Sequence, residues 1–315
     1  MRLWLTPLLF ATSIARAESL AAPPVEPPFS ARIQEAVQIR QSGQNATALT
    51  FLEALEPQVP AEYRGLWLYQ RGICAEVAWD YEAAVALHQG AIDAGGEFVL
   101  DARYRQALSL EALGRDAEAV DAIRELARAR GLDNTDRLAI AIQKATTEVK
   151  AGKRWRGTRH LNAALADAEA ANLHTYLQAK AHAALAAAHF ADAAELRLRG
   201  SEKRLVKRLK ERAALITAGE DEILKIIELD EVEWVLASLL DIGAAYEALG
   251  SELEAVAPPR GEDPAAYAQA LAPYVNNVRT KARNIYGLGI ELAVRLGWES
   301  PRVAKLREEK ARLGG

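Results

Sequence analysis

A ten-residue segment in the first third of the chain recurs at a spacing typical of helical repeats. Trp79–His88 reads WDYEAAVALH, and Gly114–Ile123, 35 residues later, reads GRDAEAVDAI. A period near 34 residues with small residues in fixed columns is typical of stacked helical hairpins, because each hairpin buries its apolar face only against its neighbours. The repeat therefore predicts a helical solenoid, a scaffold whose extended surface holds other molecules.

The alignment extends to four hairpins between residues 31 and 172. Small residues fill one column in the leading helices and another in the returning helices, where short side chains let two helices approach closely. These columns are Ala36, Gly72, Ala107 and Ala145, and then Ala48, Ala84, Ala119 and Gly157. Gly43, Gly114 and Gly152 fall at the turns, where glycine tolerates a positive φ, and Trp79 occupies the equivalent turn of the second hairpin.

These columns, the turn glycines and the run Asp80–Ala84 resemble the tetratricopeptide-repeat (TPR) family over roughly residues 29–170. The chain departs from the family pattern at Trp79 and at His88, which stands where a large apolar residue is usual. The C-terminal half is similar to exported bacterial TPR proteins, some of them envelope components of gliding-motility and secretion machinery. That resemblance rests on Trp234–Ala237, Ile242–Glu247, Ala257–Pro259 and Lys281–Tyr286. It implies a scaffold of the cell envelope without catalytic residues.

The N-terminus has the organisation of a secretion signal. Met1–Arg2 gives a positive start, Leu3–Ile14 is largely apolar, and Ala15–Ala17 fits a small-residue cleavage site. We expect cleavage after Ala17, which would place the mature protein in the periplasm or at the outer membrane; the alternative is an uncleaved anchor. Residues 18–30 are rich in proline and alanine and are interpreted as a linker.

From residue 173 to 315 the repeat signal fades while helical signals persist. The expected helices cover residues 174–199, 201–218, 221–256, 265–297 and 301–313, with interruptions near Asp230 and Pro273. The Pro- and Gly-containing segment 257–264 is a predicted break. The sequence thus predicts an all-α chain, with a TPR-like solenoid followed by a long-helix extension.

Motifs for catalysis and cofactor binding are absent from the sequence: there is no phosphate loop, dinucleotide fingerprint, nucleophile elbow or metalloprotease motif. With one cysteine and five histidines, a metal site is hard to assemble. The net charge of −4 gives no indication of nucleic-acid binding. We therefore expect no cofactor, no metal and no enzymatic activity. Cys74, flanked by small and apolar residues, is interpreted as a core residue.

The leading helices of the second and third hairpins carry matched residues 35 positions apart. In arrays of this kind, leading helices line the concave side. The expected groove residues are Tyr69, Ile73 and Glu76, with Tyr104, Leu108 and Glu111 as their equivalents. Two tyrosines, an apolar floor and two carboxylates would suit a bound peptide; alternatively, the tyrosines pack between the hairpins.

A basic stretch in the second half is a candidate docking face, because its charges recur at helical spacings. It consists of Lys203, Arg204, Lys207, Arg208 and Lys210, and a second basic cluster comprises Lys150, Lys153, Arg154, Arg156 and Arg159. Either is interpreted as solvated surface or as a contact for an acidic partner or another anionic envelope component.

The sequence as a whole predicts an exported adaptor that binds a partner protein or peptide in the groove of a TPR-like solenoid. Two alternatives remain open at this point: a glycan-cleaving cell-wall enzyme on an all-helical fold, and a structural homo-oligomer.

Overall fold

The computed structural model describes residues 28–170, 175–258 and 261–314. These residues form thirteen α-helices and two short 3-10 helices, with no strand among them, so the predicted all-α fold class is confirmed. The expected signal peptide and the linker up to residue 27 lie outside the described residues. The chain divides into two compact units, Met1–Ile140 and Ala141–Gly315.

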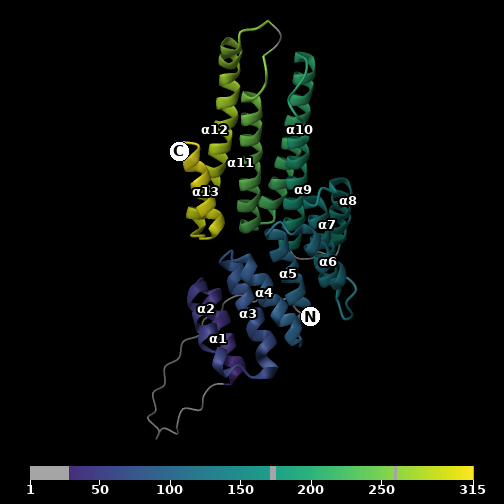
Figure 1. Cartoon of the computed structure of the whole chain (residues 1–315), viewed down its shortest axis with the longest axis vertical. Helices are drawn as coiled ribbons and strands as arrows, with labels where there is room; N and C mark the ends of the chain where they lie inside the picture. Colours follow the sequence, from purple (N-terminus) through teal and green to yellow (C-terminus); the bar gives the residue numbers. More distant parts are fainter. Residues whose placement is uncertain (1–27, 171–174, 259–260, 315) are drawn as a thin grey trace. The chain divides into compact units, whose positions relative to one another are not determined.

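The first unit is a run of helical hairpins in which each helix packs on its neighbours along the chain (Figure 1). The hairpins are α1 (Phe29–Gln41) with α2 (Asn45–Ala54), α3 (Arg64–Val77) with α4 (Tyr81–Ala94), and α5 (Val99–Ala112) with α6 (Asp116–Leu126). Short 3-10 helices at Glu56–Gln58 and Ala61–Tyr63 connect the first hairpin to the second. Helix α7 (Asn134–Lys150) contains the boundary between the units.

The predicted columns of small residues are confirmed as packing positions. Ala48, Ala84, Ala107 and Ala119 are completely buried. Gly72 faces His88, and a Cβ atom at Gly72 would lie 2.5 Å from the His88 ring. His88, the departure from the family pattern, is therefore accommodated because its neighbour on the facing helix has no side chain.

The turns also follow the sequence prediction. Gly43, Gly114 and Gly152 have φ values of 86°, 72° and 79°. Trp79, at the equivalent turn after α3, has a φ of 63°, a left-handed conformation that is uncommon for a residue with a side chain. The equivalent turns therefore have the same left-handed backbone conformation whether the residue is glycine or tryptophan.

The second unit consists of the end of α7 and six further helices. Three of them are much longer than the repeat helices: α10 (Glu202–Glu228), α11 (Val232–Glu254) and α12 (Pro264–Leu296). The others are α8 (Arg154–Ala170), α9 (Thr175–Glu195) and α13 (Pro301–Arg312). Within this unit α9 packs on α10 and α11, α11 packs on α12, and α13 packs on both α11 and α12 (Figure 1).

Aromatic rings seated against glycines hold the long helices together. Phe190 of α9 lies against Gly219 of α10, and Tyr286 of α12 lies against Gly243 of α11. Helix α10 continues to Glu228, past the expected end at Ala218. It does so because Gly219 is a packing position inside the helix. The interruption near Asp230 is confirmed, with φ of 58° at that residue.

One interruption differs from expectation, and the division into units cuts across the fourth hairpin. Helix α12 runs uninterrupted through Pro273, which is solvent-exposed. The fourth hairpin, predicted to belong with the repeats up to residue 172, lies mainly in the second unit. No helix in the described ranges combines the length and the apolar character needed to cross a bilayer.

Candidate partner-binding surfaces

The predicted groove in the first unit is partly filled by its own side chains. Tyr69 is 9% exposed, stacks on Phe98 at 5.3 Å between ring centroids, and accepts a hydrogen bond from Arg105. Ile73 is buried beside it. Tyr69 and Ile73 therefore pack between the second and third hairpins, and the expectation that they present an open binding surface is wrong. Phe98, which covers the tyrosine, is the N-cap residue of α5 and stands 35 residues after Tyr63, the N-cap residue of α3.

Glu76 is the centre of a polar network rather than a free carboxylate. It accepts hydrogen bonds from Arg105 at 2.6 Å, from His88 Nε2 at 2.8 Å and from Ser109 at 3.3 Å. His88 is completely buried, and its Nδ1 has no hydrogen-bond partner among the described residues. The network joins α3, α4 and α5, so it fixes the second hairpin against the third.

The environment keeps Glu76 ionised. Burial alone would raise the pKa of this carboxyl, but the hydrogen bond from His88 and the charge of Arg105 outweigh burial and lower it from 4.5. Burial would likewise lower the pKa of Arg105, but the charge of Glu76 raises it instead. Because the folded pKa of Glu76 is depressed, its contribution to stability is present above about pH 4.5 and is lost as the pH falls through the folded pKa.

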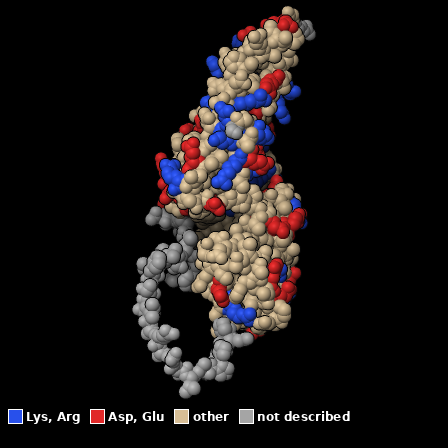
Figure 2. Space-filling model, turned by 90° about the vertical axis from the view of Figure 1, so that its left-hand side faces the viewer, with Lys and Arg blue, Asp and Glu red and all other residues tan. Residues whose placement is uncertain are grey.

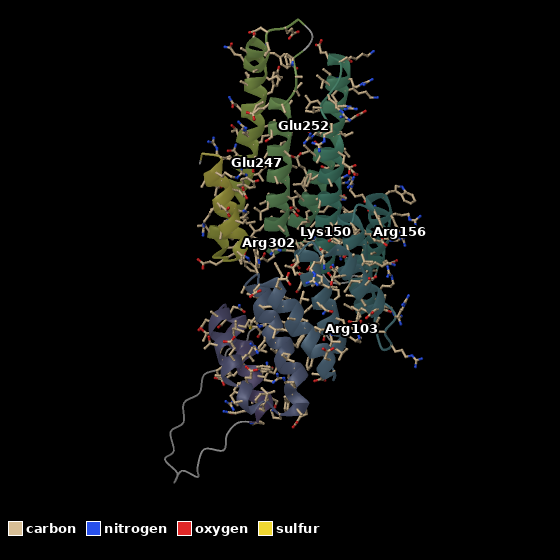
Figure 3. The ribbon with its side chains drawn as sticks, viewed as in Figure 1. Arg103, Lys150, Arg156, Glu247, Glu252 and Arg302 are labelled. Carbon is tan, nitrogen blue, oxygen red and sulfur yellow. The ribbon has the colours of Figure 1, made fainter. Side chains whose placement is uncertain are left out.

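We expect Glu76→Gln to lower the free energy of unfolding of the first unit by about 1–3 kcal/mol at pH 7, since hydrogen bonds to a charged group are lost. The difference from the unsubstituted chain should shrink in acid, where Glu76 itself becomes protonated. Urea unfolding followed by circular dichroism between pH 7 and pH 3 measures both effects. Glu125→Gln is the control, because Glu125 pairs with Arg103 on an exposed surface (Figure 3). A pH-independent difference would contradict the assignment.

The other half of the predicted groove keeps access to solvent. Tyr104, Leu108 and Glu111 of α5 are all partly exposed, and Tyr104 also packs against the cluster around Ile123 and Leu126. Burial and the negative charge of Glu111 raise the pKa of Tyr104, so the phenol stays protonated. These three residues stay candidates for partner contact.

The predicted basic face lies on the N-terminal half of α10, where most of its side chains are exposed. Lys207 pairs with Glu211 at 3.7 Å, and Arg208 donates to the carbonyl of Arg197. Between Arg197 and Arg212 the chain has eight basic and two acidic residues, so a local excess of positive charge remains. On the face drawn in Figure 2, by contrast, positive and negative side chains are interspersed.

Sequence reasoning missed the most exposed described tryptophan. Trp155 stands in the first turn of α8 and is 77% exposed, whereas Trp298 is 40% and Trp79 38% exposed. The Arg159 guanidinium lies over its ring, 5.0 Å from the centroid. The sequence does contain a signal for this pair, a tryptophan and an arginine four residues apart within the second basic cluster. An interpretation of the cluster from its charges alone does not reveal it.

A hollow of about 580 Å³ adjoins this pair. Its lining residues are mostly polar: Gly152, Arg154, Trp155, Thr158, Arg159, Asn162 and Asp192. Arg154 is held by Asp192 at 2.5 Å and by Glu195. Arg156 pairs with buried Glu148 at 3.4 Å (Figure 3). Lys153 and Arg159 make no ion pair within the described ranges, so the surface around Trp155 is net positive.

Two other hollows lie in the second unit. One, of about 460 Å³, is bordered by Glu254, Val256 and Tyr267, and the other, of about 300 Å³, by Glu247, Ser251 and Arg312. Each acidic residue in these hollows is engaged by an arginine: Glu254 by Arg279 and Glu247 by Arg312. A general acid needs an environment that favours its neutral form, whereas these ion pairs favour the ionised form of each carboxyl group. In the described part of the chain, no group of three His, Cys, Asp or Glu side chains is placed to hold a metal ion.

No family model and no curated protein matches the sequence. Among solved structures, the chain is similar to the C-terminal part of a TPR repeat-containing protein from Cytophaga hutchinsonii, with 12% identity, a TM-score of 0.39, and coverage of 89% of this chain and 95% of that chain. It is also similar to a TPR repeats protein from Bacteroides fragilis, with 12% identity, a TM-score of 0.31, and coverage of 82% and 98%. These two structures are of TPR-repeat proteins, the family that the sequence columns resemble.

Proposed function

We propose that this chain is an exported scaffold of the bacterial cell envelope that binds an acidic segment of a partner protein and catalyses no reaction. The helical hairpins supply a rigid framework, and the binding energy would come from a few exposed anchor residues. The N-terminal sequence supports export, and the packing of α1–α6 supports the scaffold role.

The observation that carries the proposal is the exposed pair of Trp155 and Arg159 beside the polar hollow. Tryptophan and arginine are the residue types most enriched among the energetically dominant positions of protein interfaces. An indole that is 77% exposed gains by burial against a partner. The stacking of Arg159 on Trp155 restricts both side chains before binding, which reduces the conformational entropy lost on association.

The charge around this pair indicates an acidic partner. Lys153 and Arg159 have no ion-pair partner among the described residues, whereas Arg156 is offset by Glu148. Asp192 and Glu195 offset Arg154 only. A carboxylate of the partner would face the free edge of the Arg159 guanidinium, which is suited to paired hydrogen bonds.

We expect Trp155→Ala to weaken partner binding by about 30-fold or more, in line with a loss of at least ~2 kcal/mol at a dominant interface position. The partner is first identified with a photo-crosslinking residue at position 158, which lines the same hollow and leaves Trp155 in place. Its crosslinked segment is then synthesised and titrated into the purified chain by calorimetry. Arg159→Gln should weaken binding less and reduce its salt dependence.

Trp298→Ala is the matched control, since Trp298 is also an exposed tryptophan of the second unit. The control should retain full affinity. Unchanged affinity of Trp155→Ala, or a crosslinked segment without acidic residues, would contradict the proposal.

Export is tested separately. The proposal expects the protein in the periplasmic or outer-membrane fraction, beginning at Glu18 when its N-terminus is determined by mass spectrometry. An intact N-terminus in the cytoplasmic fraction would remove the envelope from the proposal and leave the binding site untouched.

A further inference from the structure

Helix α10 carries an apolar stripe on its solvent side. Val206 is 48% exposed, Leu209 36%, Leu224 58% and Ile227 51%. Eighteen residues make five turns of an α-helix, so Leu224 lies in line with Val206, and Ile227 in line with Leu209. Exposed Ala213 and Thr217 fill the middle of the same stripe.

An adjacent face of α10, about 90° around the helix axis from the stripe, accounts for its packing inside the second unit. Arg212, Ile216, Gly219, Ile223 and Ile226 are buried there against α9 and α11. The stripe is therefore additional to the face that holds the helix in the fold. Two pairs of exposed aliphatic side chains joined by small residues along one side of a long helix are typical of a helix–helix interface.

The spacing of the stripe has two-fold symmetry. Its midpoint lies between Ile216 and Thr217. Val206 and Ile227 are equidistant from that midpoint, and so are Leu209 and Leu224. If a second copy lies antiparallel about this point, Val206 of one copy meets Ile227 of the other, and Leu209 meets Leu224. The same surface then serves both copies, as closed two-fold dimers require.

The charges beside the stripe are complementary in the same orientation. The N-terminal half of α10 exposes Lys203, Lys207 and Lys210, whereas the C-terminal end exposes Asp221, Glu228 and Asp230. Three charges break this separation, Glu202, Glu211 and Lys225. Two of them are offset within the helix, because Glu211 pairs with Lys207 and Lys225 pairs with Glu222. An antiparallel pair brings basic ends against acidic ends, whereas a parallel pair would place like charges together.

We propose that two copies of this protein associate antiparallel through the exposed stripe of α10. The basic face predicted from the sequence is thereby half of a self-complementary surface, distinct from the Trp155 surface that binds the partner. A contact about 40 Å long and one helix diameter wide covers only about 400–500 Å² on each copy. The area is at the lower end for specific association, so the dimer should be weak, with a dissociation constant on the order of micromolar or above.

Sedimentation velocity of the chain from Glu18 onward, over a concentration series up to several hundred micromolar, measures the association. We expect a shift from monomer to dimer mass that Leu224→Glu abolishes. Leu288→Glu is the matched control, because Leu288 is also 58% exposed and lies on α12 of the same unit. The substitutions Lys203→Glu and Lys207→Glu together should weaken the dimer at least about tenfold, and adding Asp221→Lys and Glu228→Lys should restore it.

Pulsed electron paramagnetic resonance tests the orientation. Spin labels at Lys203→Cys should lie on the order of 40 Å apart in an antiparallel dimer, because 27 residues of helix separate the two equivalent positions, whereas a label at Thr217→Cys should give a short distance. The native Cys74 is buried, so labelling is confined to the introduced cysteine. A monomer throughout the series, a dimer that Leu224→Glu leaves intact, or short distances at both labels would each overturn the proposal. Binding at Trp155 would be unaffected by any of these results.

Discussion

Replacing Gly243 by alanine is expected to destabilise the second unit, although alanine is the better helix former. Gly243 lies inside α11 against the ring of Tyr286, which is 1% exposed. A Cβ atom at this position would lie 2.1 Å from Tyr286 Cε1, well inside van der Waals contact. The ring has no room to withdraw, since its hydroxyl donates to Glu247 at 2.7 Å. Helices α11 and α12 would have to separate.

The sign of the effect follows from two opposing contributions. Alanine gains up to about 1 kcal/mol over glycine in a helix interior, whereas overpacking a tightly filled contact costs about 1–3 kcal/mol. At Gly250, seven residues further along α11, a Cβ would lie 3.6 Å from the nearest atom of Arg279. We therefore expect Gly243→Ala to lower the thermal midpoint by several degrees and Gly250→Ala to leave it equal or higher.

Two measurements separate this explanation from a general loss of helix. Hydrogen exchange should accelerate in α11 and α12 of Gly243→Ala, with the first unit unchanged. The double substitution Gly243→Ala with Tyr286→Ala should cost less than the sum of the two single substitutions, because the clash disappears with the ring. Additive costs, or a stabilised Gly243→Ala, would show that the ring and the glycine do not share one packing position.

The contrast between Gly243 and Gly250 marks the limit of sequence-based prediction for this chain. The columns of small residues in the hairpins could be predicted because the repeat places the same contact at a fixed spacing. In the long helices no repeat relates one glycine to another, so the sequence does not distinguish a glycine that seats a ring from one that faces a flexible arginine. For this reason the expected helix 201–218 stops just before Gly219, whereas α10 continues to Glu228.

The candidate sites illustrate the same limit. Repetition of Tyr69 and Tyr104 predicted a common role, but Phe98 buries one of them and not the other. A different regularity was overlooked: Glu76 and His88 are hydrogen-bonded twelve residues apart, as are Glu148 and His160. This pair joins the two helices of a hairpin in both units. In this chain, the twelve-residue spacing between the two helices of a hairpin predicts a side-chain contact better than the recurrence of one residue type on a helix face.

The second large effect concerns the buried ion pair between α10 and α11. Arg212 is 2% exposed and donates to Glu252, whose other oxygen accepts the backbone N–H of Leu198 at 2.8 Å. Glu252 is labelled in Figure 3, and its side chain is 17% exposed. The arginine is therefore the more deeply buried charge, and its Nε has no hydrogen-bond partner among the described residues.

We expect Glu252→Ala to lower the free energy of unfolding of the second unit by about 3–5 kcal/mol, since it leaves a buried cation without its counter-ion. Arg212→Met should cost less, because Glu252 can still be hydrated and keeps the hydrogen bond from Leu198. The double substitution Arg212→Met with Glu252→Gln should come within about 1 kcal/mol of the natural chain, as replacement of a buried pair by well-packed neutral groups is often neutral. Urea unfolding of the three variants measures this order.

Arg279→Met with Glu254→Gln is the control, because that pair joins α12 to α11 on an exposed surface. Exposed pairs are worth about 0–1 kcal/mol, so the control should change stability little in any combination. The decisive result is the difference between the two single substitutions. The loss of stability should depend on which partner is removed, and should be largest when the buried arginine remains. If Glu252→Ala were no worse than Arg212→Met, the desolvation of Arg212 would not be the dominant contribution, and the long helices would be held by their apolar contacts alone.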